Sequence, residues 1–269
     1  MALDTSFDFD QEAGDRDADS HSITLQHYHQ LLWSNKPLPS GRVLTLHIRG
    51  SQLQHESDLG TFRLSSDSIA TSLSKQLKRR IFWLDIPAEE IRQFKLVNGQ
   101  IGGRIVFPAN QVNGKATING ARGLHRSIGD RFDLTLECIR RHYLGEWSPL
   151  DKVLDRYRDF FALFVDFRGY VDFFLLQDLV STDQSAVRFF LEFDNFGTSP
   201  LPYDQKSYEE YRRATIAFVE ARNRRISIMS EPLTLPTIVF RPRRKTPGRA
   251  KPPLPLFDVT SFDSLTQPS

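Results

Sequence analysis

Residues 148–164 read SPLDKVLDRYRDFFALF, and this stretch decides the fold class of the chain. Ser148 can cap a helix, Pro149 suits the first helical position, and Asp151 is an acid in the first turn, where the helix dipole favours one. The apolar residues that keep to a period of 3.6 are Leu150, Val153, Leu154, Tyr157, Phe160, Phe161 and Phe164. The stretch therefore predicts a helix with one buried face in an aromatic-rich core.

The segments on either side extend the helical pattern. Residues 130–143 carry apolar side chains on one helical face, and Gly145 follows as a terminator. Residues 207–226 open with a Ser-x-x-Glu capping box and predict the last helix. Between these helices, residues 170–180 fit either helix or strand, and residues 187–193 are typical of a strand.

The first half of the chain mixes short helices with strands. Helices are expected at residues 23–33, 68–80 and 87–96. Strands are expected at residues 43–48, 61–64 and 101–107, the first two joined by a polar turn. Asn113-Gly114 indicates a hairpin, and Gly102-Gly103 a bulge or a close approach of backbones. The prediction is an α+β protein with a single domain, short antiparallel strands mainly in the first half and amphipathic helices dominating the second half.

The two ends of the chain carry opposite charge. Residues 1–21 hold seven acids and one arginine, which predicts an acidic, partly disordered arm that Phe7 and Phe9 could tether. Residues 229–269 are rich in proline and carry a basic cluster, which predicts a disordered tail. This tail could neutralise nucleic-acid phosphates, offer a polyproline II ligand, or serve only to keep the chain in solution. The predicted domain is residues 22–228.

Composition excludes several classes of protein. The chain has 269 residues, a formal charge of +2 and one cysteine, so neither an intrachain disulfide nor a multi-cysteine metal site can form. The single Cys138 is expected to be a small buried hydrophobe. No apolar run reaches the roughly 20 residues of a membrane span, and the N-terminus does not fit a signal peptide. We expect a soluble, cytoplasmic protein without a membrane partner.

A polar segment that precedes and enters the 130–143 helix is the first candidate site. Residues 119–123 read as a tight, glycine-flanked turn that exposes a guanidinium, and a charged helix follows directly. The turn and the helix N-terminus could converge on a phosphate or carboxylate. The alternative is a loop followed by a helix whose charges pair with one another. The residues of this candidate site are Arg104, Asn119, Arg122, Asp130, Arg131 and Asp133.

A second group of charges lies among aromatic residues at 166–172. Its members are Asp166, Arg168 and Asp172. A buried carboxylate is costly unless it is paired, so an ion pair with an arginine is one interpretation. The other is a carboxylate pair for acid–base chemistry or for Mg²⁺, although the spacing defines no metal site and none is assigned. The serine-rich stretch at 65–68 is interpreted as a cap for the helix after it.

Several long stretches of the chain, rather than scattered positions, resemble a known protein family. These stretches are residues 4–9, 31–34, 36–41, 64–67, 118–123, 130–143, 166–180 and 220–226. Over them the chain resembles a family of bacterial proteins known only as a domain of unknown function. The resemblance runs from about residue 4 to residue 228 and leaves the basic tail outside. It implies no activity, cofactor or catalytic residue.

Two functions from different classes follow as hypotheses. In the first, the chain binds an anionic ligand, such as a nucleotide, a phosphorylated metabolite or nucleic acid, in a polar groove lined by arginine and aspartate. In the second, it is an enzyme acting on a phosphorylated or nucleotide substrate, with Asp130, Asp133 or Asp172 as base. A protein-interaction module without a small-molecule site is a further alternative. The sequence assigns no cofactor and no oligomeric state.

Overall fold

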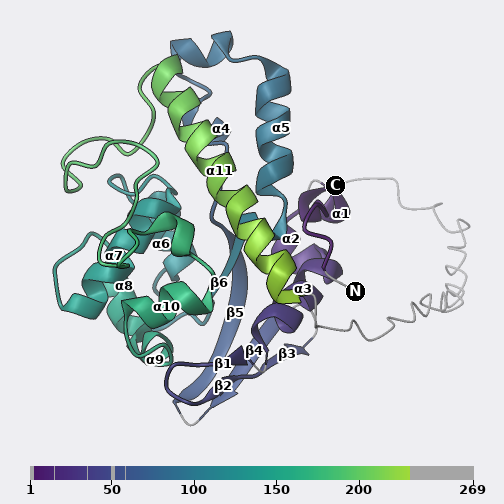
Figure 1. The fold of residues 1–269 in the computed structure, drawn as a ribbon. Helices are drawn as coiled ribbons and strands as arrows, with labels where there is room; N and C mark the ends of the chain where they lie inside the picture. Colours follow the sequence, from purple (N-terminus) through teal and green to yellow (C-terminus); the bar gives the residue numbers. More distant parts are fainter. Residues whose placement is uncertain (1–2, 15, 35, 50–51, 58, 231–269) are drawn as a thin grey trace, which may run out of the picture. The chain divides into compact units, whose positions relative to one another are not determined.

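A four-stranded antiparallel sheet forms in the first half of the chain. The computed structural model describes residues 3–14, 16–34, 36–49, 52–57 and 59–230, and the sheet has the order β3-β4-β5-β6 (Figure 1). Its strands are β3 (Leu46–Arg49), β4 (Gln52–Ser57), β5 (Gly60–Ser68) and β6 (Arg104–Pro108). A separate short pair consists of β1 (Lys36–Pro37) and β2 (Val43–Leu44).

Helices and 3₁₀ turns make up most of the remainder. Those in the first half are α1 (Phe9–Ala13), α2 (Ala18–His21), α3 (Ile23–Trp33), α4 (Ser74–Leu77), η1 (Ile81–Asp85), α5 (Ala88–Asn98), η2 (Ile101–Gly103) and α6 (Ile118–Leu124). Those in the second half are α7 (Phe132–Leu144), α8 (Asp151–Leu154), η3 (Asp155–Tyr157), α9 (Arg158–Ala162), α10 (Phe167–Phe173), η4 (Gln177–Leu179) and α11 (Gln205–Ser230). The α+β class, with strands early and helices late, is confirmed.

Residues 52–57 form the strand β4 where a polar turn was expected. Leu53 and His55 are buried while Gln52 and Glu56 are exposed, which is the alternation of a half-buried strand. The pattern contains a single aliphatic residue, so it is weak in the sequence. Pairing with β3 on one side and β5 on the other stabilises the strand.

Asn113-Gly114 forms a turn but not a hairpin. Both residues have positive φ, 54° and 68°, as the sequence suggests. The chain then enters α6, whose first turn is capped by the Thr117 hydroxyl accepting from the Gly120 amide at 3.3 Å. The expected second strand is therefore absent, and in the described part of the chain β6 pairs with β5 alone.

The stretch at 148–164 buries its apolar face as predicted but is not one continuous helix. It divides into α8, η3 and α9, because the backbone at Tyr157 (φ −115°, ψ 23°) departs from helical geometry. Leu150 rather than Ser148 occupies the N-cap of α8. Residues 170–180 are helical turns, and the strand expected at 187–193 is reduced to one bridge between Val180 and Val187.

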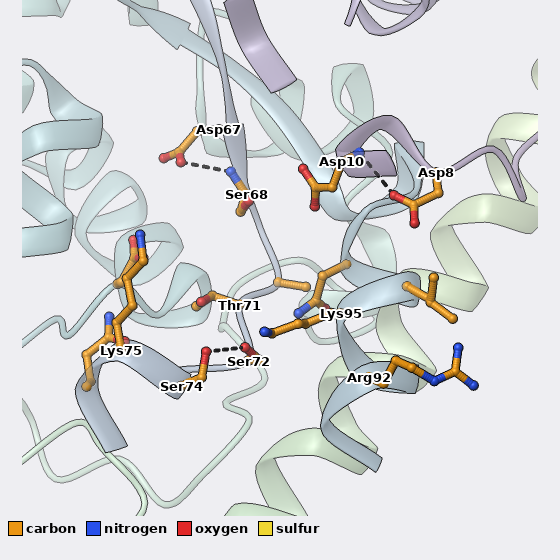
Figure 2. Close-up of a pocket in the computed structure, with 15 residues that line it drawn as sticks. Asp8, Asp10, Asp67, Ser68, Thr71, Ser72, Ser74, Lys75, Arg92 and Lys95 are labelled. Atoms are coloured by element: carbon orange, nitrogen blue, oxygen red, sulfur yellow. Dashed lines mark hydrogen bonds between the residues drawn. The ribbon is translucent and has the colours of Figure 1, made fainter. Parts of the chain in front are cut away.

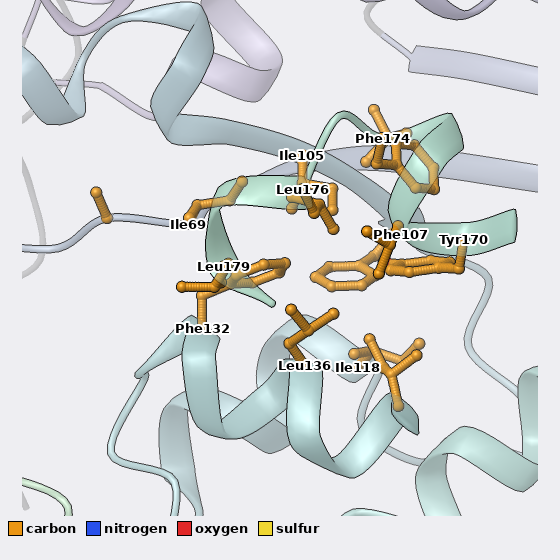
Figure 3. Packing of buried hydrophobic residues seen from close by; sticks show 14 of the residues in the cluster. Ile69, Ile105, Phe107, Ile118, Phe132, Leu136, Tyr170, Phe174, Leu176 and Leu179 are labelled. Atoms are coloured by element: carbon orange, nitrogen blue, oxygen red, sulfur yellow. The ribbon is translucent and has the colours of Figure 1, made fainter. Parts of the chain in front are cut away.

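The aromatic core joins β6 to these helices. Phe107 from β6 packs with Phe132 of α7 at a ring-centroid distance of 6.4 Å, and Tyr170 and Phe174 pack beside them with their ring centroids 5.0 Å apart (Figure 3). All four side chains are fully buried. Cys138 of α7 is buried too, as expected of a small hydrophobe.

The long helix α11 packs along η2 and α5. Its start is capped by Asp204, whose carboxylate accepts from the Ser207 amide at 2.8 Å while the Ser207 hydroxyl accepts from the Asp204 amide at 3.1 Å. The capping box therefore lies three residues earlier than predicted. Gly102 makes the close approach that the glycine pair suggested, because its amide donates to Asn223 Oδ1 of α11 at 2.8 Å.

Residues 3–14 and 16–21, expected as an acidic arm, are folded against the remainder of the domain. Leu3 and Phe9 are buried, and the Leu3 amide donates to the Ser230 hydroxyl at 3.1 Å. Asp8 and Asp17 cap α1 and α2, so several of the acids serve the helix starts. Within these residues the arm is thus part of the domain. Of the predicted disordered tail, residues 231–269 lie outside the described residues.

Candidate functional site

A polar pocket of about 500 Å³ opens where five segments meet. Its walls come from the start of α1, the end of β5, the loop into α4, one face of α5 and the residue Asp130 before α7 (Figure 2). The volume suits a ligand the size of a nucleotide or a phosphorylated sugar. Only Asp130 among the predicted site residues lines it directly.

One end of the pocket carries hydroxyls and free cations. Thr71, Ser72 and Ser74 line it together with Lys75 and Lys95, and Lys95 points into the pocket near Ser72 (Figure 2). Both lysines are exposed, and neither forms a hydrogen bond or ion pair with another described side chain. This end is therefore a positive region with nearby donors, the chemistry that holds a phosphate or carboxylate.

Tyrosines of α11 hold the loop that carries these hydroxyls. Tyr211 donates its hydroxyl to the Thr71 carbonyl at 2.9 Å, and Tyr208 donates to the Ser72 carbonyl at 3.4 Å. Both rings are fully buried. The loop backbone is thereby fixed from behind, so the hydroxyls in front of it are positioned before any ligand arrives.

The opposite end of the pocket is acidic. Asp8, Asp10 and Asp67 lie there, with Asp130 on the wall (Figure 2). Asp10 pairs with Arg104 at 2.5 Å, and this arginine also donates to the Ser68 hydroxyl at 3.2 Å. Carboxylates partly engaged with arginine still offer free oxygen lone pairs, which accept from hydroxyl or amino groups.

Arg122 was predicted to be exposed in a glycine turn, and this prediction is wrong. The residue lies in α6 and its side chain is fully buried. Its guanidinium pairs with Asp67 at 2.5 Å and Asp130 at 3.2 Å, and it donates to the Asp130 carbonyl at 2.9 Å. All of its charge is thus neutralised inside the protein, and it holds the acidic wall of the pocket from behind.

Asn119 joins Arg122 at Asp67, whereas Arg104 is engaged with Asp10 and the Ser68 hydroxyl. With its amide oriented to satisfy both ends, Asn119 Nδ2 donates to Asp67 Oδ1 at 3.1 Å. Burial is the largest effect on Asp67 and raises the pKa of its carboxyl, although Arg122 opposes the shift. Asp67 was missed in the sequence because the 65–68 stretch reads as a helix cap, whereas it is the end of β5.

Arg131 and Asp133 form a separate, buried unit. Arg131 Nε donates to Asp133 Oδ1 at 3.1 Å, and its Nη1 donates to the Pro200 carbonyl at 2.9 Å. Asp133 also accepts from the Phe190 amide at 2.9 Å. The pair therefore anchors the chain around 190–200 to α7, and neither residue lines the pocket.

Asp166, Arg168 and Asp172 are exposed and do not join the pocket. Asp166 caps α10 by accepting from the Gly169 amide at 2.7 Å, and Asp172 accepts from the Gln177 and Gln184 amides. Its nearest arginine nitrogen, Arg168 Nε, is 4.0 Å away. Neither the buried ion pair nor the carboxylate pair predicted there is present.

Backbone strain is found at two points around the pocket. Leu73, between the lining residues of the α4 loop, has φ 53°, and Asp130 has φ 66°. Positive φ is unfavourable for residues with a Cβ and tends to concentrate where a site fixes its geometry. Both strained residues belong to the walls that carry the polar groups.

Asp19 of α2 lies behind the acidic end, and its carboxyl has a raised pKa. Its carboxylate accepts from the Ser66 amide at 2.6 Å, and burial raises its pKa from 3.8 to about 6. The folded chain therefore binds more protons than the unfolded chain between about pH 4 and 6, so the free energy of unfolding falls as pH rises through this window.

The Asp19→Asn variant should lose this pH dependence. We expect the wild type to be destabilised, relative to the variant, by about 1–2 kcal/mol between pH 4 and 7, after allowance for the partial exposure of the carboxyl. Chemical denaturation across this range measures the effect, with the exposed Asp159→Asn as the control. Parallel pH profiles for wild type and Asp19→Asn would refute the assignment.

A serine and a histidine of this region also meet, but not as a catalytic pair. His29 Nε2 lies 2.9 Å from the Ser66 hydroxyl, and the Trp33 indole donates to His29 Nδ1 at 3.1 Å. Since the indole can only donate, Nδ1 is unprotonated and Nε2 carries the hydrogen, so His29 donates to Ser66. Burial, aided by Arg222 and Arg104, lowers the pKa of His29 to about 3. The imidazole cannot take the serine proton as a base.

Comparison with known proteins identifies the family of the chain and no closer relative. Neither the curated proteins nor the solved structures contain a match. In the part of the chain that the structure describes, no group of three potential metal ligands and no helix able to cross a membrane is found. A family model matches residues 3–226, in agreement with the resemblance seen in the sequence. The chain belongs to DUF6994, a family of unknown function.

Proposed function

We propose that this chain binds a small phosphorylated metabolite or nucleotide in the pocket between α4, α5 and the end of β5. The observation that carries the proposal is that Lys75 and Lys95, neither of which pairs with a described side chain, line the pocket on either side of three hydroxyls of a fixed loop. A phosphate beside these hydroxyls can attract either flexible lysine and accept several hydrogen bonds without displacing any internal ion pair.

The acidic end favours a ligand with a second polar part. Asp67, Asp10 and Asp8 can accept from sugar hydroxyls or an amine, while they repel a second negative group. A ribose or another polyol attached to one phosphate fits both ends. A nucleic-acid strand, with a phosphate on every nucleotide, fits the acidic wall less well.

The same pocket leaves an enzymatic alternative. Asp67 sits on its wall with a raised pKa, which is the condition for a carboxyl to exchange protons with a substrate. The single cysteine is no nucleophile, since burial raises the pKa of Cys138 to about 12. Binding without turnover of the probes described next would favour the binding protein, and turnover lost in Asp67→Asn would favour the enzyme.

The proposal is tested by calorimetric titration of the full chain with AMP, ribose 5-phosphate and their unphosphorylated counterparts. We expect the phosphorylated compounds alone to bind, and the Lys75→Gln/Lys95→Gln variant to bind them at least about tenfold more weakly, because each lost charge-assisted bond contributes roughly 1.5–3 kcal/mol.

Lys115→Gln is the matched control, since Lys115 is an exposed lysine outside the pocket. It should bind as the wild type does. Equal affinity of the double variant and the wild type would place the phosphate elsewhere and overturn the proposal, and so would the absence of binding to every phosphorylated probe.

A further inference from the structure

A basic and apolar tip lies between α4 and α5, and none of its residues lines the proposed ligand pocket. We call residues 78–84 the tip; in Figure 1 they lie at the top of the view, beside the N-terminal end of α11. None of the residues of η1 is buried. Ile81 is 88% exposed and Leu84 83%, values that mark apolar side chains standing in solvent.

The geometry of η1 places these two side chains together. A 3₁₀ turn has about three residues per turn, so positions i and i+3 lie above one another. Ile81 and Leu84 therefore share one face and form a single protruding apolar wedge. The turn is fixed to the domain by Trp83, whose ring packs edge-on against Tyr208 of α11 at 5.2 Å.

Three cations accompany the wedge. Lys78, Arg79 and Arg80 precede it directly, all three are exposed, and none forms an ion pair with a described residue. Asp85, at the end of the turn, is the one acid within η1. The tip thus combines a net positive charge with a pair of exposed aliphatic side chains.

We propose that the tip binds an anionic lipid surface, with Ile81 and Leu84 inserted at the boundary of headgroups and acyl chains. The charge of the three cations complements acidic headgroups, and long basic side chains can remain in the headgroup layer while neighbouring apolar groups enter below it. Two side chains offer far less area than the roughly 800 Å² that each partner of a stable protein complex covers. Shallow insertion into a bilayer needs no such area.

The tip is proposed to contact the surface of a lipid bilayer, and no part of the chain is proposed to cross it. None of the tip residues 78–84 lines the pocket, so the two proposals can be tested separately. A chain that binds lipid but no phosphorylated probe would support this inference alone, and the converse result would support the pocket alone.

The test is flotation of the full chain with vesicles of phosphatidylcholine, alone or mixed with phosphatidylglycerol. We expect binding to the mixed vesicles only, weakened by added salt. Ile81→Ser/Leu84→Ser should lower the partition coefficient at least about tenfold, because two apolar side chains lose their burial. Arg79→Glu/Arg80→Glu should lower it by a similar factor.

Leu124→Ser is the control, since Leu124 is 86% exposed on α6 outside the tip. It should bind like the wild type, and all variants should keep the wild-type circular dichroism and melting temperature. Failure of the wild type to float with mixed vesicles would overturn the proposal. Undiminished binding of Ile81→Ser/Leu84→Ser would overturn it as well, because the attraction would then come from charges elsewhere, including those of residues 241–251.

Discussion

Replacing Arg122 with methionine should lower the free energy of unfolding by about 3–5 kcal/mol. The substitution removes the partner of Asp67 and Asp130 and leaves two carboxylates facing each other behind the pocket wall. It also removes the donor to the Ser68 carbonyl, which Arg122 Nη1 contacts at 3.0 Å. Arg122→Lys should recover only part of the loss, since an ammonium cannot reach all of these acceptors in one plane.

Chemical denaturation of the purified variants measures this effect. Arg158→Met is the control, because Arg158 is 66% exposed and its ion pair with Asp155 stands in solvent. It should change stability by less than about 1 kcal/mol. If Arg122→Met were as stable as the wild type but failed to bind phosphorylated probes, Arg122 would be a ligand contact and the description of it as an internal support would be wrong.

Gly102→Ala should destabilise the fold by about 2–4 kcal/mol. A Cβ at this position would lie 2.5 Å from Asn223 Oδ1 and 2.5 Å from the Val219 carbonyl oxygen, so α11 would have to move away from η2. The same movement would break the hydrogen bond from the Gly102 amide to Asn223. Overpacking of this kind typically costs about 1–3 kcal/mol, to which the lost hydrogen bond adds.

Gly120→Ala should instead raise the free energy of unfolding. The nearest atoms to its Cβ, in Ala116 and Thr117, would be 3.7 Å away, and the residue lies in the helix α6. Alanine is favoured over glycine in a helix by about 1 kcal/mol, so thermal or chemical unfolding should show a modest gain in stability. If Gly102→Ala and Gly120→Ala lowered the free energy of unfolding by the same amount, the close contacts around Gly102 would not be the cause of its destabilisation.

The parts of the fold that the sequence predicted best are those decided by local chemistry. The helix predicted at residues 23–33 is α3 with the same bounds, α5 begins after Pro87 close to its predicted start, and α7 ends at Gly145 with φ 69°. Each of these signals acts within one helical turn. Helix ends marked by such signals can therefore be predicted from the sequence without knowledge of the tertiary structure.

The errors arise where tertiary contacts outweigh a local pattern. Gly120 and Gly123 suggested a turn, but the Thr117 cap and the packing of Ile118 make the segment helical, at a cost of about 1 kcal/mol for each glycine. Arg122 consequently turns inward instead of into solvent. Burial of its charge depends on Asp67, which is 55 positions away and invisible to periodicity.

The candidate site was found only in part for the same reason. The sequence pointed to the neighbourhood of Asp130, which does line the pocket, but not to Lys75 or Lys95. These lysines belong to different helices and resemble any solvated surface lysine. Their significance comes from the meeting of α4 and α5 around one cavity, and no spacing along the chain encodes it.

The position of a bound phosphate tests the central claim most directly. A crystal structure of the full chain with the tightest-binding phosphorylated probe should place the phosphorus beside Lys75 and Lys95, with phosphate oxygens about 3 Å from a lysine nitrogen and from a hydroxyl of Thr71, Ser72 or Ser74. The hydroxyl-bearing part should reach toward Asp67. A phosphate bound at another surface, with this pocket unoccupied, would contradict the account.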